Sequence, residues 1–384
     1  MKNITTHVCL VSGQPLPNLI PLIDPKLGVK RAILLVTPDM EQRADWLKAV
    51  LQPRGIAVEI RKLTDAWDFE GAQSEIMELL DAQETSDADA GIALNATGGT
   101  KMMSIAAYEA FRAYELPVFY VHPERDELVW LQPGEQPPRE LADRLKIEPF
   151  LQAHGARVES DPRRSVANAD ALAVARDLVE RIEEYGDAIG QLNWLSENAR
   201  RASLRAIIKE PRPGLEEVID IFATRSYIQW QGNDRFSFPD GESLAFVMGG
   251  WMEVYVFDEV RRLRDAHPRI HDVAWGVNVN REQRGNQIPN ELDVVFLHNN
   301  RLHIIECKTR RFREEGEDSA GAEALYKLDA LRDLMGGLQA RAMLVSYRDL
   351  PDHDRTRAAD LGIAVCAGAQ LRNLKQHLTD FMGG

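Results

Sequence analysis

The sequence predicts an α/β protein of more than one domain, beginning with a doubly wound α/β domain. Its 384 residues exceed the roughly 100 to 200 residues of a typical single domain. Short apolar runs typical of strands alternate with segments of helical periodicity from residue 5 to residue 122. Near the C-terminus, two apolar runs flank a pair of asparagines, which indicates a β-hairpin in a second α/β domain.

The N-terminal alternation predicts a parallel sheet with crossover helices. Ligands of such sheets bind at the carboxyl ends of the strands. We expect strands at 5–12, 31–37, 57–63, 91–95 and 117–122, with helices at 40–52, 71–83 and 101–115.

A polar stretch at 151–165 without a clear period marks a domain boundary. We therefore expect domains at 1–150 and 241–384, joined by a middle piece at 151–240. That piece has apolar residues at helical spacing, followed by a small hairpin. A helical connector is favoured because no basic recognition helix is visible, and a winged-helix-like module is the alternative.

Composition limits the classes of function. The net charge of -14 argues against a protein that coats nucleic acid non-specifically, because such binding needs a surplus of Lys and Arg. No apolar run approaches the roughly 18 residues of a membrane span, so we expect no membrane partner. Cys9, Cys307 and Cys366 lie far apart and form no CxxC pair, which suits a reducing, cytoplasmic compartment.

The C-terminal hairpin carries the clearest candidate for catalysis. If Asn299 and Asn300 form a two-residue turn, His298 faces Arg301 and, further along, Asp293 faces Glu306. Facing residues have Cβ atoms roughly 4.5 to 5.5 Å apart, close enough for two carboxylates to share a divalent cation.

Lys308 projects from the same face as Glu306, because strand side chains alternate. Two neighbouring acids repel each other unless a cation such as Mg²⁺ or Mn²⁺ lies between them. Such a cation polarises a phosphate, and Lys308 would orient or deprotonate the attacking water. The alternative is an amphipathic hairpin with solvated charges. However, Val294–Leu297 and Ile304–Ile305 are almost continuously apolar, as in a strand buried on both faces.

An acid on one strand and Glu306-Cys307-Lys308 on the next resembles the PD-(D/E)XK nuclease superfamily. The resemblance implies a metal site at Asp293, Glu306 and Cys307, with Lys308 in catalysis. Leu292 stands where that motif usually has proline.

The same resemblance implies further residues outside the motif. An acid from the preceding helix often joins the metal site, and Glu253 fits that place, although it fits a solvated helix residue nearly as well. Tyr326 or Lys327 is the candidate polar residue on the following helix. Just past the motif, Arg310, Arg311 and Arg313 are candidates for contacts with a phosphate backbone.

A second candidate site lies in the N-terminal domain, where Asn95–Met103 follows a strand and opens a helix. Gly98 and Gly99 allow close backbone approach, and a helix N-terminus offers free N–H groups to an anion. The segment is neither a Walker A loop nor a GxGxxG motif. Ser12–Asn18 follows the first strand and reaches the same sheet edge. The alternative is an ordinary βα turn.

A Thr-Gly-Gly-Thr-Lys loop upstream of a PD-(D/E)XK motif is similar to the CARF nucleases of type III CRISPR defence. In that family the CARF domains form a homodimer that binds a cyclic oligoadenylate, most often cyclic tetra-adenylate. Binding switches on metal-dependent cleavage of DNA, RNA or both. The resemblance implies ligand contacts at Ser12, Gln14, Thr37, Asn95, Thr97, Gly98, Gly99, Thr100 and Lys101.

Two other functions remain open from the sequence. One is a constitutive restriction or repair endonuclease whose N-terminal domain serves only in dimerisation. The other is a ligand-responsive transcription regulator that uses residues 168–240 to bind DNA.

Overall fold

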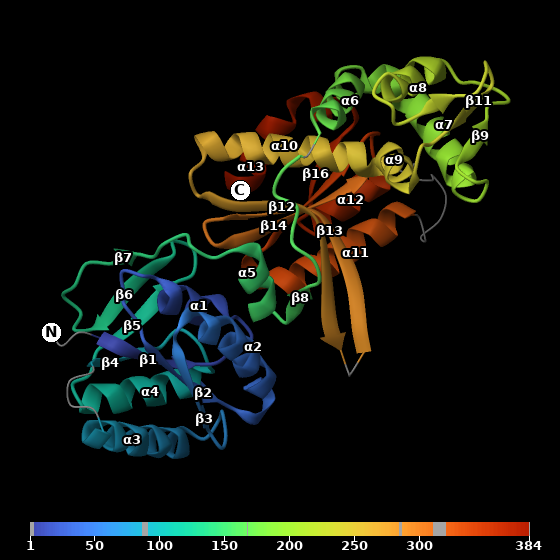
Figure 1. The fold of residues 1–384 in the computed structure, drawn as a ribbon. Helices are drawn as coiled ribbons and strands as arrows, with labels where there is room; N and C mark the ends of the chain where they lie inside the picture. The colour runs from blue at the N-terminus through green and yellow to red at the C-terminus, as the bar shows by residue number, and fades with distance from the viewer. Residues whose placement is uncertain (1–3, 87–90, 167, 284–285, 310–319, 384) are drawn as a thin grey trace. The chain divides into compact units, whose positions relative to one another are not determined.

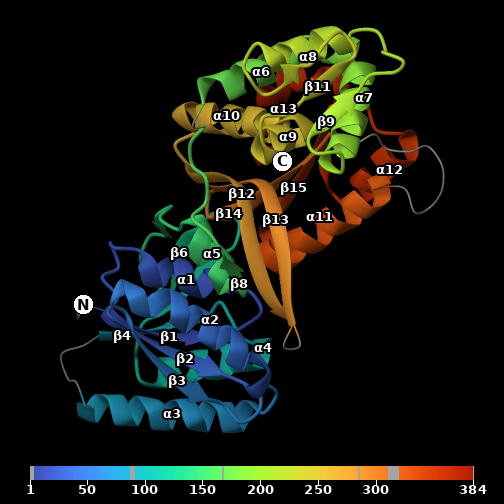
Figure 2. The same cartoon turned by 45° about the vertical axis from the view of Figure 1, so that its right-hand side comes forward.

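The computed structural model describes residues 4–86, 91–166, 168–283, 286–309 and 320–383. The chain folds into two compact units (Figures 1 and 2), and each is described separately. The first comprises Met1–Arg157 and Arg281–Gln287, and the second comprises Val158–Asn280 and Ile288–Gly384. Among the described residues, no helix combines the length and apolar character needed to cross a membrane.

The first unit is built on a seven-stranded sheet of order β3-β2-β1-β4-β5-β6-β7. β1 to β5 run parallel, which confirms the predicted parallel sheet. β6 and β7 add an antiparallel edge that the sequence analysis did not predict. The strands are β1 (Ile4–Leu10), β2 (Arg31–Val36), β3 (Ala57–Lys62), β4 (Gly91–Asn95), β5 (Val118–His122), β6 (Glu127–Gln132) and β7 (Arg139–Glu140).

Helices cover both faces of this sheet, with α1 and α2 on one side and α3 and α4 on the other (Figure 1). The chain runs from β1 outward to β3 and then returns to β4 on the other side of β1. This change of direction is the position at which doubly wound sheets bind ligands. The helices are α1 (Leu16–Ile23), α2 (Glu41–Leu51), α3 (Phe69–Ser86), α4 (Lys101–Ala113) and α5 (Ile147–Ala153).

The second unit contains most of a six-stranded mixed sheet of order β16-β15-β14-β13-β12-β8. β13 and β14 are antiparallel, whereas β14, β15 and β16 run parallel. The strands are β8 (Ala156–Val158), β12 (Ile270–Gln283), β13 (Asn286–His298), β14 (Arg301–Lys308), β15 (Arg341–Ser346) and β16 (Ala364–Ala367). One face carries α10 (Trp251–Ala266) and α13 (Leu374–Gly383), and the other carries α11 (Ala320–Gly336) and α12 (Asp352–Asp360) (Figures 1 and 2).

The middle piece contains a small antiparallel sheet of order β10-β11-β9. Its order of helix, strand, helix and hairpin is that of the winged-helix-like alternative. However, α8 carries Glu216 and Glu217 in its first turn and is no basic recognition helix. The elements are α6 (Ala169–Glu180), α7 (Ile182–Arg200), β9 (Arg205–Ile207), α8 (Leu215–Ala223), β10 (Gln229–Trp230), β11 (Arg235–Ser237) and α9 (Gly241–Ala245).

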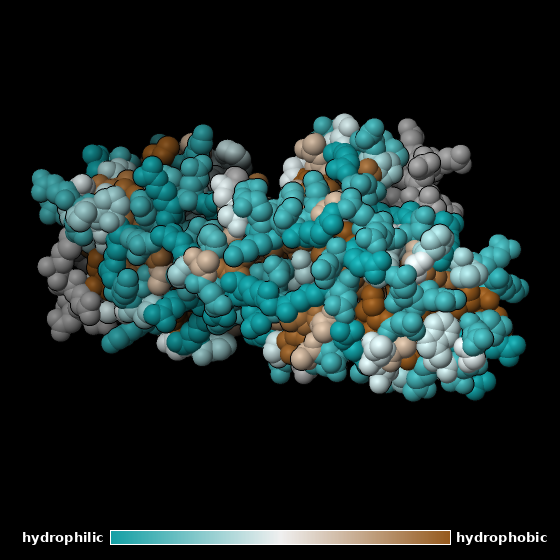
Figure 3. Space-filling model, turned by 90° about the horizontal axis from the view of Figure 1, so that it is seen from above, coloured by the Kyte–Doolittle hydropathy of each residue, from teal (hydrophilic) through white to brown (hydrophobic). Residues whose placement is uncertain are grey.

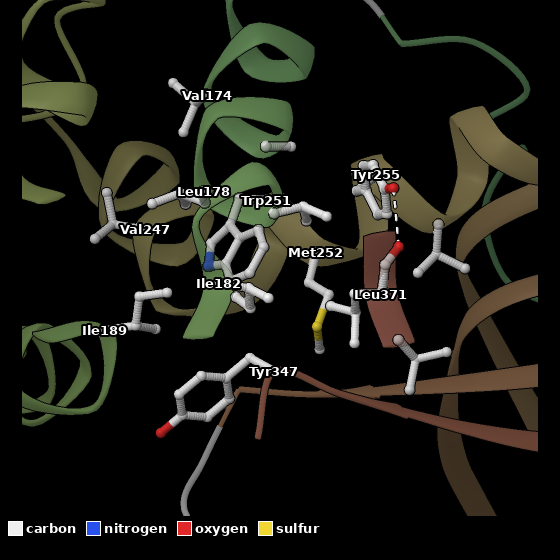
Figure 4. Packing of buried hydrophobic residues seen from close by; sticks show 14 of the residues in the cluster. Val174, Leu178, Ile182, Ile189, Val247, Trp251, Met252, Tyr255, Tyr347 and Leu371 are labelled. Carbon is white, nitrogen blue, oxygen red and sulfur yellow. Dashed lines mark hydrogen bonds between the residues drawn. The ribbon is translucent and has the colours of Figure 1, made fainter. Parts of the chain in front are cut away.

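One hydrophobic core joins the middle piece to the C-terminal sheet. Trp251 and Met252 of α10 pack among residues of α6 and α7 and near Tyr347, which follows β15 (Figure 4). Tyr255 closes this side of the core, where its hydroxyl donates to the carbonyl of Leu371 at 3.1 Å. This packing fixes the rotation of α10 and therefore the direction of its polar face.

The face of the molecule drawn in Figure 3 is mostly hydrophilic, with small separate hydrophobic patches.

Candidate functional site

The β13–β14 hairpin forms with the predicted register. Asn299 and Asn300 both have positive φ, 51° and 52°, as the two-residue turn requires. The pairing extends from His298–Arg301 to Val294–Ile305. Asp293 lies one position beyond the last of these pairs, and its Oδ2 accepts a hydrogen bond from the Cys307 N–H at 2.7 Å. The carboxyl groups of Asp293 and Glu306 therefore lie within electrostatic reach of each other at the end of the hairpin.

Glu306 and Lys308 share one face of β14. Glu306 is only 3% exposed, and its Oε1 accepts a hydrogen bond from Lys308 Nζ at 2.5 Å. Burial alone would lower the lysine pKa, but the negative charges of Glu306 and Asp293 outweigh it, so the pKa of Lys308 is raised. The lysine is therefore a fixed positive charge beside the two acids.

Glu253 joins them from α10, immediately after a π-helical turn at Phe246–Gly250. Such turns are rare and frequent at functional sites. Burial raises the pKa of Glu253 to about 7, with further contributions from the charges of Glu291 and Glu306. Burial also raises the pKa of Asp293 to about 8, with contributions from Glu306 and Glu253. Three carboxyl groups thus lie within electrostatic reach of one another.

The chemistry of this donor set suits a hard divalent cation. Oxygen ligands and mutually repelling buried acids are what Mg²⁺ or Mn²⁺ would stabilise. Among the described residues, no group of three or more His, Cys, Asp or Glu side chains is already arranged as a metal site. Cys307 is unsuited through its thiol, because that side chain alternates to the other face and packs against the hydrophobic core.

The two candidates on the following helix are both exposed to solvent. Tyr326 is 55% exposed, and the Arg357 guanidinium lies over its ring at 5.6 Å. Lys327 is exposed on the same helix. The other predicted cations, Arg310, Arg311 and Arg313, lie outside the described residues.

The residues that hold the end of β14 were not predicted from the sequence. Asn193 of α7 donates to the Thr309 carbonyl at 2.5 Å, directly beyond Lys308. The Thr309 hydroxyl donates to the carbonyl of Met248, inside the π-helical turn, also at 2.5 Å. These hydrogen bonds join three segments that are far apart in the chain, so no local sequence pattern predicts them.

A cavity of 470 Å³ lies at the carboxyl ends of β1 to β4, where the doubly wound sheet predicts a ligand. Each of the four loops that follow these strands contributes to its wall. The lining residues are Val11, Ser12, Gly13, Thr37, Pro38, Asp39, Met40, Thr64, Asp65, Ala66, Trp67, Gly99, Thr100 and Met103.

Part of the predicted ligand set lines this cavity, namely Ser12, Thr37, Gly99 and Thr100. Asn95 and Thr97 are not in its wall, and their side chains bond to the protein itself. Asn95 Nδ2 donates to the Pro17 carbonyl at 2.8 Å. The Thr97 hydroxyl donates to Asn95 Oδ1 at 2.6 Å and accepts from the Val121 N–H at 2.8 Å.

The remaining predicted contacts, Gln14, Gly98 and Lys101, are also absent from the wall. A Cβ on Gly98 would lie 2.0 Å from the Leu10 carbonyl oxygen, so glycine is needed there for packing. Lys101 is exposed in the first turn of α4, which Thr100 caps by accepting from the Met103 N–H at 3.2 Å.

Of the wall formed by the loops after β2 and β3, only Thr37 was predicted from the sequence. Asp39 Oδ1 accepts a hydrogen bond from the Thr37 hydroxyl at 2.6 Å, and Trp67 is 72% exposed at the cavity. These segments have no motif of their own.

Comparison with known proteins agrees with this arrangement. Residues 6–150 match the family model of the Card1 CARF domain, and residues 240–383 match that of the Card1-like endonuclease domain. Protein VC1899 from Vibrio cholerae is 31% identical over 98% of both chains, with a TM-score of 0.89. The chain belongs to the Card1-like CARF endonuclease family. No curated protein matches it.

Two further solved structures place this Card1-like endonuclease among related folds. Can2 from Sulfobacillus thermosulfidooxidans, in complex with cyclic tetra-adenylate, is 26% identical over 99% of both chains, with a TM-score of 0.82. A type III CRISPR defence DNA nuclease activated by cyclic oligoadenylate is 18% identical. It covers 90% of this chain and 45% of its own, with a TM-score of 0.56, and shares the fold alone. Asp293, Glu306, Lys308 and Glu253 all lie within the matched endonuclease domain.

Proposed function

We propose that this Card1-like endonuclease cleaves phosphodiester bonds of DNA or RNA with a divalent cation, and that cyclic tetra-adenylate bound to a CARF homodimer activates it. The carboxyl groups of Glu253, Asp293 and Glu306 beside the ammonium of Lys308 are the observation that carries the proposal.

The chain offers oxygen ligands for the cation at one end of the hairpin. The Asp293 and Glu306 carboxylates would hold Mg²⁺ or Mn²⁺, with the main-chain oxygen of Cys307 beside them and Glu253 completing the acidic side. When bound, the cation polarises the scissile phosphate and lowers the pKa of a bound water. Lys308 would orient the attacking water and hold a phosphate oxygen through its remaining N–H groups.

The cavity in the first unit supports the choice of activator. Can2, which shares the fold over nearly its whole length, is bound to cyclic tetra-adenylate. In this chain the Ser12 and Thr100 side chains and the glycines of the loops would meet the ligand, and Lys101 would balance phosphate charge. The cavity measures 470 Å³, a volume typical of a site for one small-molecule ligand. Cyclic tetra-adenylate is a ring of four nucleotides, so we expect a second chain to supply the rest of its site.

A second copy has an apolar face to bind. Ile105 is 52% exposed, Leu131 is 42% exposed and Tyr120 is 39% exposed, and all three line a shallow cavity beside α4. Large side chains exposed together in this way are typical of interfaces. We therefore propose this face for the homodimer contact.

A cleavage assay tests the proposal. The full chain is incubated with single-stranded DNA, duplex DNA or RNA, with Mn²⁺, Mg²⁺ or EDTA, and with or without cyclic tetra-adenylate. We expect cleavage only when both metal and activator are present. Cleavage in EDTA contradicts the metal role, cleavage without activator contradicts the sensor role, and no cleavage of any substrate contradicts the nuclease itself.

A further inference from the structure

A basic segment interrupts this acidic chain at the end of α7. Between residues 194 and 209 there are four basic side chains and one acidic side chain, although the net charge of the whole chain is -14. The basic residues are Arg200, Arg201, Arg205 and Lys209. This segment lies outside both matched family domains, which end at 150 and resume at 240.

The segment begins at the nuclease site. Asn193 bonds to Thr309, the residue after Lys308, so the following residue, Trp194, starts beside the catalytic strand. Residues seven apart lie on the same helical face, which places Arg200 in line with Asn193 and Arg201 in line with Trp194. At 1.5 Å per residue, the two arginines lie about 10 Å further along α7.

These side chains are presented to solvent. Trp194 is 65% exposed, and the side chains of Arg200 and Arg201 are 56% and 81% exposed. A solvated helix face accounts for the arginines. The indole is a large ring left open to solvent one residue after Asn193, and exposed aromatic side chains with basic neighbours are a usual means of binding single strands.

The arginines are only partly neutralised. Glu197 bonds to Arg200 at 2.6 Å and lies 4.0 Å from Arg201, so one acid serves two cations. Beyond the helix, Arg205 and Lys209 have no ion pair among the residues that the structure describes. The edge therefore retains positive charge that nucleic-acid phosphates could neutralise.

We propose that a single-stranded segment of the substrate runs from the nuclease site along the C-terminal half of α7. A base stacks on Trp194, and Arg200 and Arg201 contact the phosphates that follow. Stacking on an open indole requires an unpaired base, and basic side chains with an exposed aromatic residue are the usual means of binding single strands. This inference rests on the proposed nuclease function and names how its substrate is held.

Binding of labelled oligonucleotides tests the path without depending on cleavage. Fluorescence anisotropy is measured on the full chain in EDTA, with cyclic tetra-adenylate, using single-stranded DNA, single-stranded RNA and duplex DNA at several salt concentrations. We expect Trp194→Ala to weaken single-strand affinity about tenfold and Trp194→Phe to retain most of it. Arg200→Gln with Arg201→Gln should reduce the salt slope by about 1.4.

Arg261→Gln is the matched control. Arg261 is 54% exposed on a helix and bonds to Asp258 at 2.8 Å with the same i,i+3 spacing as Arg200 and Glu197. We expect that variant to bind like the wild type. A photocrosslink from an iodouracil-containing oligonucleotide should appear in the peptide that spans 182–200.

Several outcomes overturn the inference. If the Trp194→Ala variant and the double arginine variant both bind single strands with wild-type affinity, the proposed path along α7 is contradicted. Equal binding of duplex DNA, equally sensitive to Trp194→Ala, removes the stacking role. A wild-type chain that binds single strands through α7 but never cleaves them supports the path and contradicts only the proposed nuclease function.

Discussion

The nuclease site and the CARF cavity show two different relations between motif and site. On β13 and β14 the motif side chains converge, because the alternation of side chains along each strand and the pairing register place them on the same face of the hairpin. At the end of β4 and in the loop that follows, the side chains of Asn95 and Thr97 bond to the protein itself, and Gly98 is needed for its contact with Leu10. A strand motif therefore predicts its contacts residue by residue, whereas a loop motif predicts mainly where the site lies.

The largest expected effect tests the strand motif. Glu306→Gln removes a carboxylate charge from the proposed metal site and leaves Lys308 without its charged partner. We expect activated cleavage to fall about 10³-fold or more. Measurement of kcat with saturating metal and cyclic tetra-adenylate checks this.

Activator binding serves as the internal control for Glu306→Gln. The substitution lies in the second unit and should leave the affinity for cyclic tetra-adenylate unchanged in a calorimetric titration. Cleavage within tenfold of the wild type would show that Glu306 is a structural carboxylate.

The next effect concerns the glycines of the loops. Gly98→Ala would place a Cβ 2.0 Å from the Leu10 carbonyl oxygen, so we expect a loss of about 3 kcal/mol in the free energy of unfolding. Gly13→Ala is the matched control, since nothing lies within 4 Å of its added Cβ. Thermal unfolding of both variants decides the comparison. Equal melting temperatures would contradict the packing role of Gly98.

Much of the fold could be predicted because strand patterns are local. Apolar runs that alternate with segments of helical periodicity predicted β1 to β5, and the two adjacent asparagines were enough to predict the hairpin register. The antiparallel edge at β6 and β7 was missed, because short strands around Pro133 have no comparable pattern. The bonds of Asn193 and Thr309 were missed because they join segments far apart in the chain.

A smaller effect separates loop building from ligand binding. Thr97→Val removes the acceptor of the Val121 N–H, so we expect about 1–3 kcal/mol less stability. Ser12→Ala changes a residue in the cavity wall whose hydroxyl makes only long bonds within its loop, to the Gln14 carbonyl at 3.3 Å and from the Gln14 N–H at 3.4 Å. It should therefore weaken cyclic tetra-adenylate binding about threefold with little loss of stability. Thermal unfolding and calorimetry on both variants give the two readouts. The distinction fails if Ser12→Ala unfolds early or if Thr97→Val changes only affinity.

A small effect on catalysis alone tests whether α7 positions the catalytic strand. Asn193→Ala removes the bond to the Thr309 carbonyl, which lies directly beyond Lys308, so we expect kcat to fall about fivefold with little change in KM. Gln191→Ala is the matched control on the same helix, because its amide donates to the Glu210 carbonyl at 2.7 Å, away from the acids. Asn193→Ala loses one amide-to-carbonyl bond, whereas Gln191→Ala also loses the bond that its Oε1 accepts from the Arg212 N–H at 2.8 Å, so the control should lose at least as much stability. A fall in kcat confined to Asn193→Ala assigns the effect to the position of Lys308, whereas equal falls would assign it to the stability of α7.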